Sequence, residues 1–318
     1  MNIATLTLNP ALDKSTTTER LQPSKKLRSE YPSYDPGGGG LNVSRAIRIM
    51  GGRSLAIYAA GGPTGDKIGE LLDKEGIKQQ VIGTQNPTRE NLMVMERSTG
   101  NHYRFGMPGY ELSQQEQQYC LDAVEALPDS IRYLVASGSL PPGVDDDFYG
   151  KVAKIAQKKG IKCAVDTSGA ALKKAADMGL CLMKPNLGEL SSLAGQEEIS
   201  GMEQEKIATR MLNEGKADIL VVSLGARGAM VATRDGIDYV VPPTVKQKST
   251  VGAGDSMLGG IILSLSRGDE LMDAINWGVA AGTAATMTPG TELCRRQDVE
   301  DIYSWLKGKS HQRMPHGR

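Results

Sequence analysis

The sequence alternates short apolar segments with longer amphipathic ones, and this rhythm constrains the fold more than any other feature. Between residues 113 and 223, helix-like segments lead repeatedly into short strand-like segments. Apolar strands that alternate with amphipathic helices are typical of a parallel sheet covered by helices on both faces. We therefore predict an α/β fold with a mostly parallel sheet and a hairpin over 229–241. The predicted strands are 4–8, 55–60, 133–136, 162–166, 181–183 and 218–223, and the predicted helices are 43–50, 113–126, 145–159, 170–178, 203–214, 255–267, 269–287 and 297–306.

Residues 13–35 and 86–108 do not follow this rhythm. The first segment is polar and rich in Thr and Ser, and the second contains two alternating strands, 91–97 and 102–107, joined by a turn. We expect both to form a small β-sheet that makes a lid over a cleft, with simple edge decoration of the core as the alternative. The predicted domains are an α/β core of residues 1–12, 36–85 and 109–318, and a discontinuous lid of residues 13–35 and 86–108.

The composition excludes several classes of protein. Lys plus Arg and Asp plus Glu both number 37, so no net charge favours nucleic acid or a membrane as a partner. The longest apolar runs, such as 219–222, are too short to span a bilayer. His102 is the one histidine outside the basic tail 307–318, which disfavours a Ser-His-Asp hydrolase or a histidine-rich metal site. The scattered cysteines and the absence of a leader pattern predict a soluble cytoplasmic protein.

The segment from Thr250 to Asp255 joins a turn of small residues to a carboxylate at the start of a predicted helix. Gly252, Ala253 and Gly254 let the backbone approach a ligand closely, and N–H groups at a helix N-terminus bind anions. Asp255 beside such a site is a candidate general base for a hydroxyl that attacks a phosphate. An ordinary glycine-rich turn with Asp255 as a helix cap is the alternative.

Four consecutive glycines, Gly37 to Gly40, precede another predicted helix. Such a run is costly in chain entropy unless the backbone must lie close to something. We interpret it as a backbone surface against which a polyhydroxylated ligand lies, with Asn42 contributing an amide. A flexible surface loop is the alternative. Further polar residues follow predicted strands, at the edge where open parallel sheets bind ligands; these are Asp13, Ser139 and Asp166.

Lys184-Pro185-Asn186 follows the predicted strand 181–183, and Glu189 lies three residues beyond Asn186. Asn186 and Glu189 share one face of a helical turn, so their oxygens could hold Mg²⁺ through its water shell. A helix capping box explains the same spacing equally well.

The turn from Ser223 to Gly228 either borders a nucleotide or simply connects a strand to the hairpin. Three basic residues, Lys26, Arg89 and Arg104, fall in or beside the predicted lid. Scattered surface charges are the default interpretation, and only convergence in space would make these residues a phosphate clamp.

Four of these motifs occur in an order that resembles the ribokinase-like sugar kinases, the PfkB family. The resemblance extends from residue 1 to about residue 306, and the ordered set is more specific than any single motif. The motifs are Asn9-Pro10-Ala11-Leu12-Asp13, Gly37-Gly38-Gly39-Gly40-Leu41-Asn42-Val43, Lys184-Pro185-Asn186 with Glu189, and Thr250-Val251-Gly252-Ala253-Gly254-Asp255.

The resemblance implies a role for each matching residue. Asp255 would accept the proton of the sugar hydroxyl, and Gly252, Ala253 and Gly254 would form the anion hole for the γ-phosphate. Such kinases dimerise through their lid sheets, so the resemblance also implies a homodimer in which one subunit's Lys26 reaches the site of the other. The sugar hydroxyls would bind Asp13, Gly38, Gly39 and Asn42, and the 6-phosphate would bind Arg89, Arg104, Ser139 and Lys26.

The same resemblance implies ATP with Mg²⁺ as the co-substrate, and potassium as a further ion. Asn186 and Glu189 would organise the Mg²⁺. Many family members carry Asp at the position of Ser249, which leaves the affinity for potassium open. The residues that border ATP would be Lys184, Asn186, Ser223, Gly225, Gly228 and Thr283, and those of a potassium loop would be Ser249, Val251, Ala285, Thr288, Gly290 and Glu292.

The resemblance implies phosphorylation of fructose 6-phosphate at its 1-hydroxyl, which gives fructose 1,6-bisphosphate. Gly39 favours this substrate, because 1-phosphofructokinases and tagatose-6-phosphate kinases usually carry Lys there. A kinase for tagatose 6-phosphate or fructose 1-phosphate is the alternative within the same class. A protein that binds sugar phosphates without catalysis is the alternative from another class, although the intact segment Gly252 to Asp255 argues against it.

Overall fold

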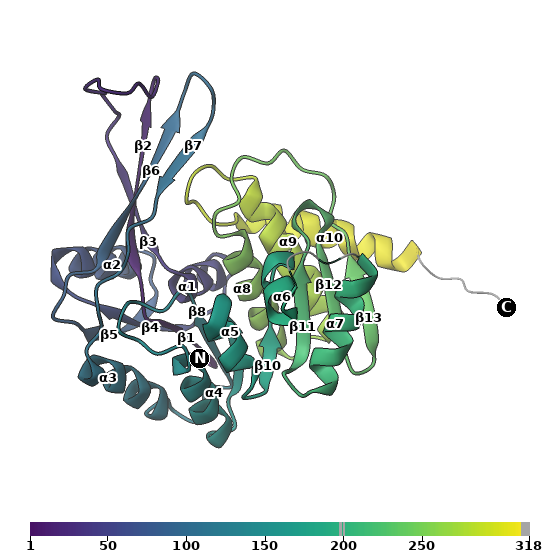
Figure 1. The fold of residues 1–318 in the computed structure, drawn as a ribbon. Helices are drawn as coiled ribbons and strands as arrows, with labels where there is room; N and C mark the ends of the chain where they lie inside the picture. The colour runs from purple at the N-terminus through teal and green to yellow at the C-terminus, as the bar shows by residue number, and fades with distance from the viewer. Residues whose placement is uncertain (197–198, 200, 313–318) are drawn as a thin grey trace.

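The computed structural model describes residues 1–196, 199 and 201–312 (Figure 1). Within these residues, one large sheet runs through the molecule and a smaller sheet projects from it. The large sheet is parallel from β5 to β11 and ends in the antiparallel strands β12 and β13, which confirms the mostly parallel sheet and its hairpin. In spatial order its strands are β13 (Gly236–Val240), β12 (Ala229–Thr233), β11 (Ala217–Ser223), β10 (Leu180–Met183), β9 (Lys162–Asp166), β8 (Tyr133–Ser137), β1 (Ile3–Thr7), β4 (Leu55–Ala60) and β5 (Lys78–Gly83).

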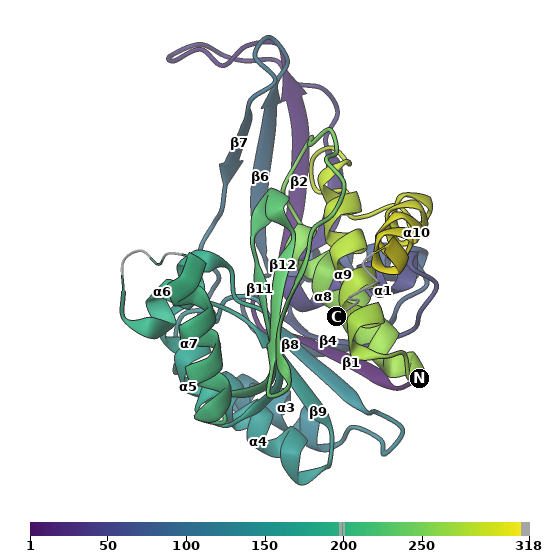
Figure 2. The same ribbon diagram turned by 90° about the vertical axis from the view of Figure 1, so that its right-hand side faces the viewer.

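Helices cover both faces of the large sheet because strand side chains alternate between two hydrophobic cores. Leu134 of β8 packs in one core, and the next residue, Val135, packs in the other. Figure 2 shows the two helical layers on opposite sides of the sheet. The first core involves α3 (Gln114–Glu125), α4 (Phe148–Lys158), α5 (Gly169–Ala176), α6 (Leu187–Ala194) and α7 (Gly201–Asn213), and the second involves α1 (Gly39–Ile49), α8 (Ala253–Arg267), α9 (Leu271–Thr286) and α10 (Arg296–Gln312).

Two elements of the first hundred residues were not predicted, namely α2 (Gly62–Lys74) and the edge strand β5. Ile68 and Leu72 of α2 pack against Tyr58 in a third, smaller core. Helix α10 continues to Gln312, beyond the predicted end at residue 306, and the tail 313–318 lies outside the described residues. In the part of the chain that the structure describes, we find no helix that is both long and apolar enough to cross a bilayer.

The small sheet projects from the large one as a narrow blade (Figures 1 and 2). Its central strands β2 and β6 are parallel, and β3 and β7 flank them in antiparallel orientation. Residues directly opposite one another share a face of a sheet. One face therefore carries Asp13, Asn91 and Arg104, and the other face carries Leu92 and Phe105. The strands are β2 (Ala11–Thr18), β3 (Ser33–Gly37), β6 (Arg89–Glu96) and β7 (His102–Phe105).

Candidate functional site

A cavity of about 280 Å³ opens at the carboxyl edge of the large sheet. Strands β8, β9 and β10 end at this edge, so the loops that follow them meet there. The N-termini of α1 and α8 reach the same place from the second helical layer. The cavity is lined by Gly39, Ser137, Gly138, Ser139, Asp166, Thr167, Ser168, Glu189 and Asp255.

Asp255 stands in the first turn of α8 and faces the cavity. The cap position of this helix is Gly252, whose φ of 67° places it in the left-handed region that favours glycine. The Asp255 carboxylate does not cap the helix. Its Oδ2 instead accepts a hydrogen bond from the Asn42 side-chain amide at 2.9 Å. The glycine run and the Gly-Ala-Gly turn, more than 200 residues apart in sequence, thus meet at one carboxylate.

Burial raises the pKa of Asp255 to about 6, and the nearby Asp166 carboxylate adds to the effect. The Asn42 amide and the Lys184 ammonium act in the opposite direction, because both stabilise the ionised form. A carboxylate with a pKa of about 6 is ionised at neutral pH and is still basic enough to accept a proton from an attacking hydroxyl.

Lys184 is a buried cation paired with Asp166, one of the residues that line the cavity. Its side chain is 6% exposed, and Nζ lies 3.3 Å from Oδ2 of Asp166. Burial alone would lower the pKa of Lys184, but the neighbouring carboxylates, Asp166 foremost, raise it overall. A Cβ added at Gly254 would lie 3.1 Å from this Nζ, so the turn before Asp255 passes close to the ammonium. The site therefore places one positive charge next to the turn from Gly252 to Gly254, which is predicted to bind an anion.

Asn186 and Glu189 form the capping box that their spacing allows. Asn186 Oδ1 accepts a hydrogen bond from the Glu189 N–H at 2.9 Å, and Glu189 Oε2 accepts one from the Asn186 N–H at 2.8 Å. Glu189 nevertheless lines the cavity, where burial raises its pKa and Asp166 adds to the rise. Among the described residues, we find no group of three or more His, Cys, Asp or Glu side chains that could hold a metal ion.

Asp13, at the foot of the small sheet, approaches the glycine run. Asn91 Nδ2 donates a hydrogen bond to Asp13 Oδ1 at 2.8 Å, and a Cβ at Gly37 would lie 2.3 Å from the other carboxylate oxygen. Burial raises the pKa of Asp13, and the bond from Asn91 partly offsets this rise. Position 37 must therefore be glycine for the Asp13 carboxylate to lie where it does.

The three predicted phosphate-binding cations have different surroundings. Arg89 donates hydrogen bonds to the carbonyls of Asn9, Pro10 and Met107, at 3.0, 3.3 and 2.8 Å. Arg104 is exposed on β7, on the face that carries Asp13. Lys26 is exposed between β2 and β3.

Ser139 lines the cavity, and its hydroxyl accepts a hydrogen bond from Asn9 Nδ2 at 3.1 Å. Gly39 lines it too, and a Cβ there would lie 2.2 Å from the Ser137 hydroxyl. Gly38 adopts a φ of 113° just before α1, and a Cβ there would meet the backbone of Pro10 at 3.1 Å. The glycine run thus packs against neighbouring loops and is not a free surface loop.

Most of the predicted nucleotide-binding residues lie around the ends of β10 and β11, whereas Thr283 lies in α9. The Ser223 N–H donates a hydrogen bond to the Pro185 carbonyl at 2.9 Å, which brings Ser223 beside Lys184 and Asn186. Gly225 and Gly228 both have positive φ in the tight turn that follows. The Thr283 hydroxyl bonds to the Val279 carbonyl within its own helix.

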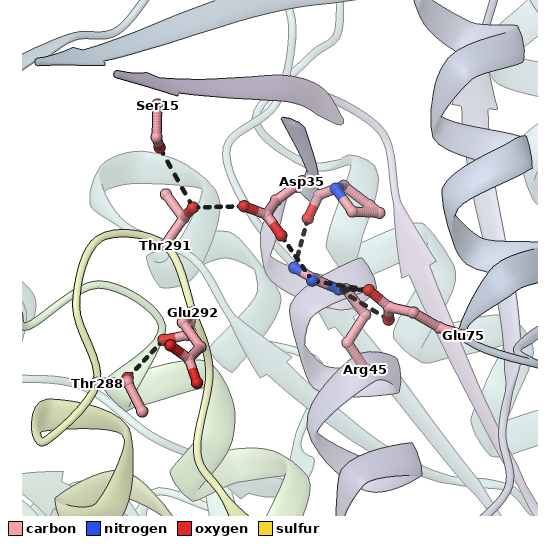
Figure 3. Close-up of polar contacts among 8 residues, drawn as sticks. Ser15, Asp35, Arg45, Glu75, Thr288, Thr291 and Glu292 are labelled. Carbon is pink, nitrogen blue, oxygen red and sulfur yellow. Dashed lines mark hydrogen bonds and ion pairs between the residues drawn. The ribbon is translucent and has the colours of Figure 1, made fainter. Parts of the chain in front are cut away.

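The predicted potassium residues bring two segments together. The Ser249 hydroxyl donates to the Gly290 carbonyl at 2.8 Å and accepts from the Val251 N–H at 3.1 Å. The Thr288 hydroxyl lies 2.7 Å from the Glu292 carbonyl (Figure 3) and 2.8 Å from the Ala285 carbonyl. The Glu292 carboxylate does not take part, because it pairs with Arg295.

Two site residues were not predicted as such. Asp166 stood out only as a polar residue at the end of a strand, and its ion pair with Lys184 depends on the order of β9 and β10 in the sheet. Asn91 lies beside Asp13 because β2 and β6 pair in parallel. Neither the sheet order nor the register can be read from residue types, so no stronger signal was present in the sequence.

A ribokinase-like fold with a buried carboxylate and a buried ammonium beside a glycine-rich turn at a helix N-terminus is typical of a class of phosphotransferases. The chain belongs to the pfkB family of carbohydrate kinases, whose model matches residues 8–298. It is 44% identical to the ATP-dependent 6-phosphofructokinase isozyme 2 of Escherichia coli (strain K12), over 96% of this chain and 99% of that protein. It is 31% identical to the 1-phosphofructokinase of Borreliella burgdorferi, over 95% and 99% of the two chains. The crystal structure of phosphofructokinase-2 from Escherichia coli in complex with potassium superimposes with a TM-score of 0.93, at 43% identity and with 96% and 99% of the chains covered.

Proposed function

We propose that this protein is an ATP-dependent 6-phosphofructokinase, which phosphorylates the 1-hydroxyl of fructose 6-phosphate. The observation that carries the proposal is the Asp255 carboxylate, held by Asn42 in a cavity beside the turn from Gly252 to Gly254. Phosphoryl transfer needs a base near the attacking oxygen and fixed dipoles near the transferred phosphate. Asp255 would be the base, and the N–H groups of the same helical turn would supply the dipoles.

In the proposed mechanism, Asp255 uses the carboxylate oxygen that Asn42 does not hold to accept the proton of the 1-hydroxyl. The N–H groups at the start of α8 would bind the equatorial oxygens of the transferred γ-phosphoryl group, over which its charge is spread, while its bond to the β-phosphate oxygen breaks and ADP leaves. Lys184 adds a positive charge that water does not screen, because its side chain is buried. Asp13, Gly38 and Gly39 lie against the sugar.

Mg²⁺ fits the acidic side of the cavity. Asp166 and Glu189 both line it, and they offer the hard oxygen ligands that Mg²⁺ accepts directly or through its water shell. When bound with ATP, the ion supplies charge neutralisation at the phosphates. The capping box leaves one Glu189 oxygen without a hydrogen bond to Asn186, so both roles are compatible.

The 6-phosphate would lie under the small sheet, which acts as a lid, and Arg104 would reach it from β7. We assign Arg89 a supporting role, because its guanidinium already binds three carbonyls that shape the loop around Asn9. Lys26 would approach from the partner subunit of a homodimer. The small sheet supports this assembly, since the face opposite Asp13 exposes Tyr34, Tyr103 and Phe105.

We place the enzyme in the cytoplasm, where its four free cysteines would remain reduced. Potassium would bind the segment pair around Ser249 and Gly290, as the complex of the Escherichia coli relative suggests. The carbonyls there belong to Val251, Ala285 and Gly290, and the Ser249 hydroxyl already uses one of them.

A coupled ADP-release assay tests the proposal directly. With Mg-ATP, we expect kcat/KM to be highest for fructose 6-phosphate among fructose 6-phosphate, tagatose 6-phosphate, fructose 1-phosphate and ribose. Preference for another phosphosugar would keep the mechanism and change the substrate. Thermal stabilisation by sugar phosphates without turnover of any of them would instead support a binding protein.

A further inference from the structure

The carboxylate of Asp35 lies at the foot of the small sheet, where β3 leads into the glycine run, and two parts of the core hold it (Figure 3). Its Oδ1 accepts a hydrogen bond from Nη2 of Arg45 on α1 at 3.1 Å. Its Oδ2 accepts one from the Thr291 hydroxyl at 2.8 Å. The Thr291 hydroxyl also lies 3.5 Å from the Ser15 hydroxyl on β2.

Arg45 is the fixed end of this chain of contacts. Its side chain is 8% exposed, and Nε donates to both oxygens of Glu75 at 2.9 and 3.0 Å. Nη1 donates to the Pro36 carbonyl at 2.9 Å. A planar guanidinium held by several acceptors at once has little freedom to turn. Arg45 therefore fixes both Asp35 and the next residue of β3 relative to α1.

Thr291 belongs to the loop that contacts the residues just before the anion-binding turn. The carbonyl of the preceding Gly290 accepts the hydrogen bond from Ser249, and the Ser249 hydroxyl in turn holds the N–H of Val251. Val251 leads directly into the turn from Gly252 to Gly254. On the small sheet, Asp35 of β3 lies directly opposite Asp13 of β2. One carboxylate thus connects the sugar side of the site with the phosphate side.

We propose that Asp35 and Thr291 are positioning residues that couple the small sheet, where the sugar binds, to the turn that binds the transferred phosphate. The expected change in kinetics rests on the proposed function, whereas the expected change in backbone motion of residues 248–254 does not. When the sugar orders the small sheet, the Asp35–Thr291 contact transmits that order to the loop behind the turn. Without the contact, sugar binding must order the two parts separately, and the affinity for the sugar falls.

Thr291→Val tests the coupling, because valine keeps the shape of threonine and removes the hydrogen bond. We expect KM for fructose 6-phosphate to rise about tenfold, the scale of a lost hydrogen bond to a charged group. The affinity for ATP measured without sugar and the melting temperature should stay near wild-type values, because the coupling between the two sites acts only when the sugar is bound. Thr291→Ser keeps the hydroxyl and should restore KM. Thr209→Val, which removes a hydroxyl bonded within α7, is the matched control.

Amide hydrogen exchange of residues 248–254 gives a second measurement that needs no turnover. We expect faster exchange in Thr291→Val than in Thr291→Ser or the wild type. Unchanged KM and unchanged exchange in Thr291→Val would overturn the inference, as would equal losses for both substrates together with a lower melting temperature. If the wild type does not phosphorylate fructose 6-phosphate but exchange responds as expected, the proposed function fails and the coupling stands.

Discussion

At the level of single residues, Asp255 combines a raised pKa with a fixed orientation. Burial makes the carboxylate more basic, and the bond from Asn42 leaves one of its oxygens for a substrate hydroxyl. Neither property follows from the residue type. Both depend on the contact between the start of α8 and the start of α1.

Asp255→Asn removes the base and keeps the shape of the side chain. We expect kcat with fructose 6-phosphate to fall by roughly 10²- to 10⁴-fold, the usual scale for a lost acid–base group. Steady-state kinetics of the folded variant, checked by circular dichroism, measures the effect. Near-normal turnover would rule out Asp255 as the base.

The pH dependence of activity should report the ionisation of Asp255. A base acts only when it is deprotonated, so kcat/KM should be level above pH 7 and fall as the pH drops below about 6. A phosphate monoester also titrates near pH 6, so the substrate contributes to the same fall. The residual rate of Asp255→Asn carries only the substrate's contribution. Identical profiles for the variant and the wild type would contradict the assignment.

The sequence predicted the residues that line the cavity better than the residues that hold them. Asp255 and Asn42 stood in recognisable motifs, and the structure joins them directly. Asp35 and Arg45 stood in no pattern that residue types reveal, because their contacts depend on how the small sheet meets α1 and the loop around Thr291. Motifs identify chemical groups, whereas the contacts between them come from packing.

At the level of elements, α1 lies unusually close to the end of β1. A Cβ at Gly40 would lie 2.5 Å from the Thr7 hydroxyl and 2.7 Å from the Leu6 carbonyl oxygen. The glycine run therefore does two things, since it approaches the cavity at Gly39 and allows close packing of helix on strand at Gly40.

Gly40→Ala should destabilise the fold, because the strand backbone cannot move away from the added methyl group. We expect the free energy of unfolding to fall by about 1–3 kcal/mol, the range for overpacking a tight site. Urea denaturation measures it. Gly83→Ala is the matched control, because a Cβ there meets nothing within 4 Å. Equal midpoints for the two variants would show that α1 can shift outward.

The sequence predicted the buried strands well and the peripheral elements poorly. The predicted strands 55–60, 162–166 and 229–233 match β4, β9 and β12. The edge strand β5 is mostly exposed and polar, so no hydrophobic period marks it. Only three residues of α2 are buried, and three glycines, Gly62, Gly65 and Gly69, fall in its first two turns.

At the level of the whole molecule, the small sheet has two chemically different faces. One carries Asp13 and Arg104, and the other exposes aromatic side chains to water. Phe105 is 48% exposed in the single chain, and an apolar face of this kind is typical of an interface between copies.

Phe105→Glu should weaken the proposed homodimer, because it places a charge on that apolar face. If the proposed dimer forms, we expect the variant to sediment as a monomer at concentrations where the wild type sediments as a dimer, and to lose the part of its sugar affinity that Lys26 of the partner subunit would supply. Val81→Glu is the matched control, since Val81 is 49% exposed on β5, away from the small sheet. Equal sedimentation of both variants and the wild type would exclude this face as the interface.

The parallel pairing of β2 with β6 has a consequence for how the chain is made. Ala11 of β2 pairs with Arg89 of β6, so a growing chain must add more than 70 residues before β2 meets this partner. Until β6 has been synthesised, the edge of β2 that will pair with it faces water. A strand with one Asp, one Lys, one Ser and three Thr among its eight residues tolerates that interval better than an apolar one, which would attract another nascent chain. The polarity of β2 therefore suits its synthesis as well as its place beside the proposed sugar site.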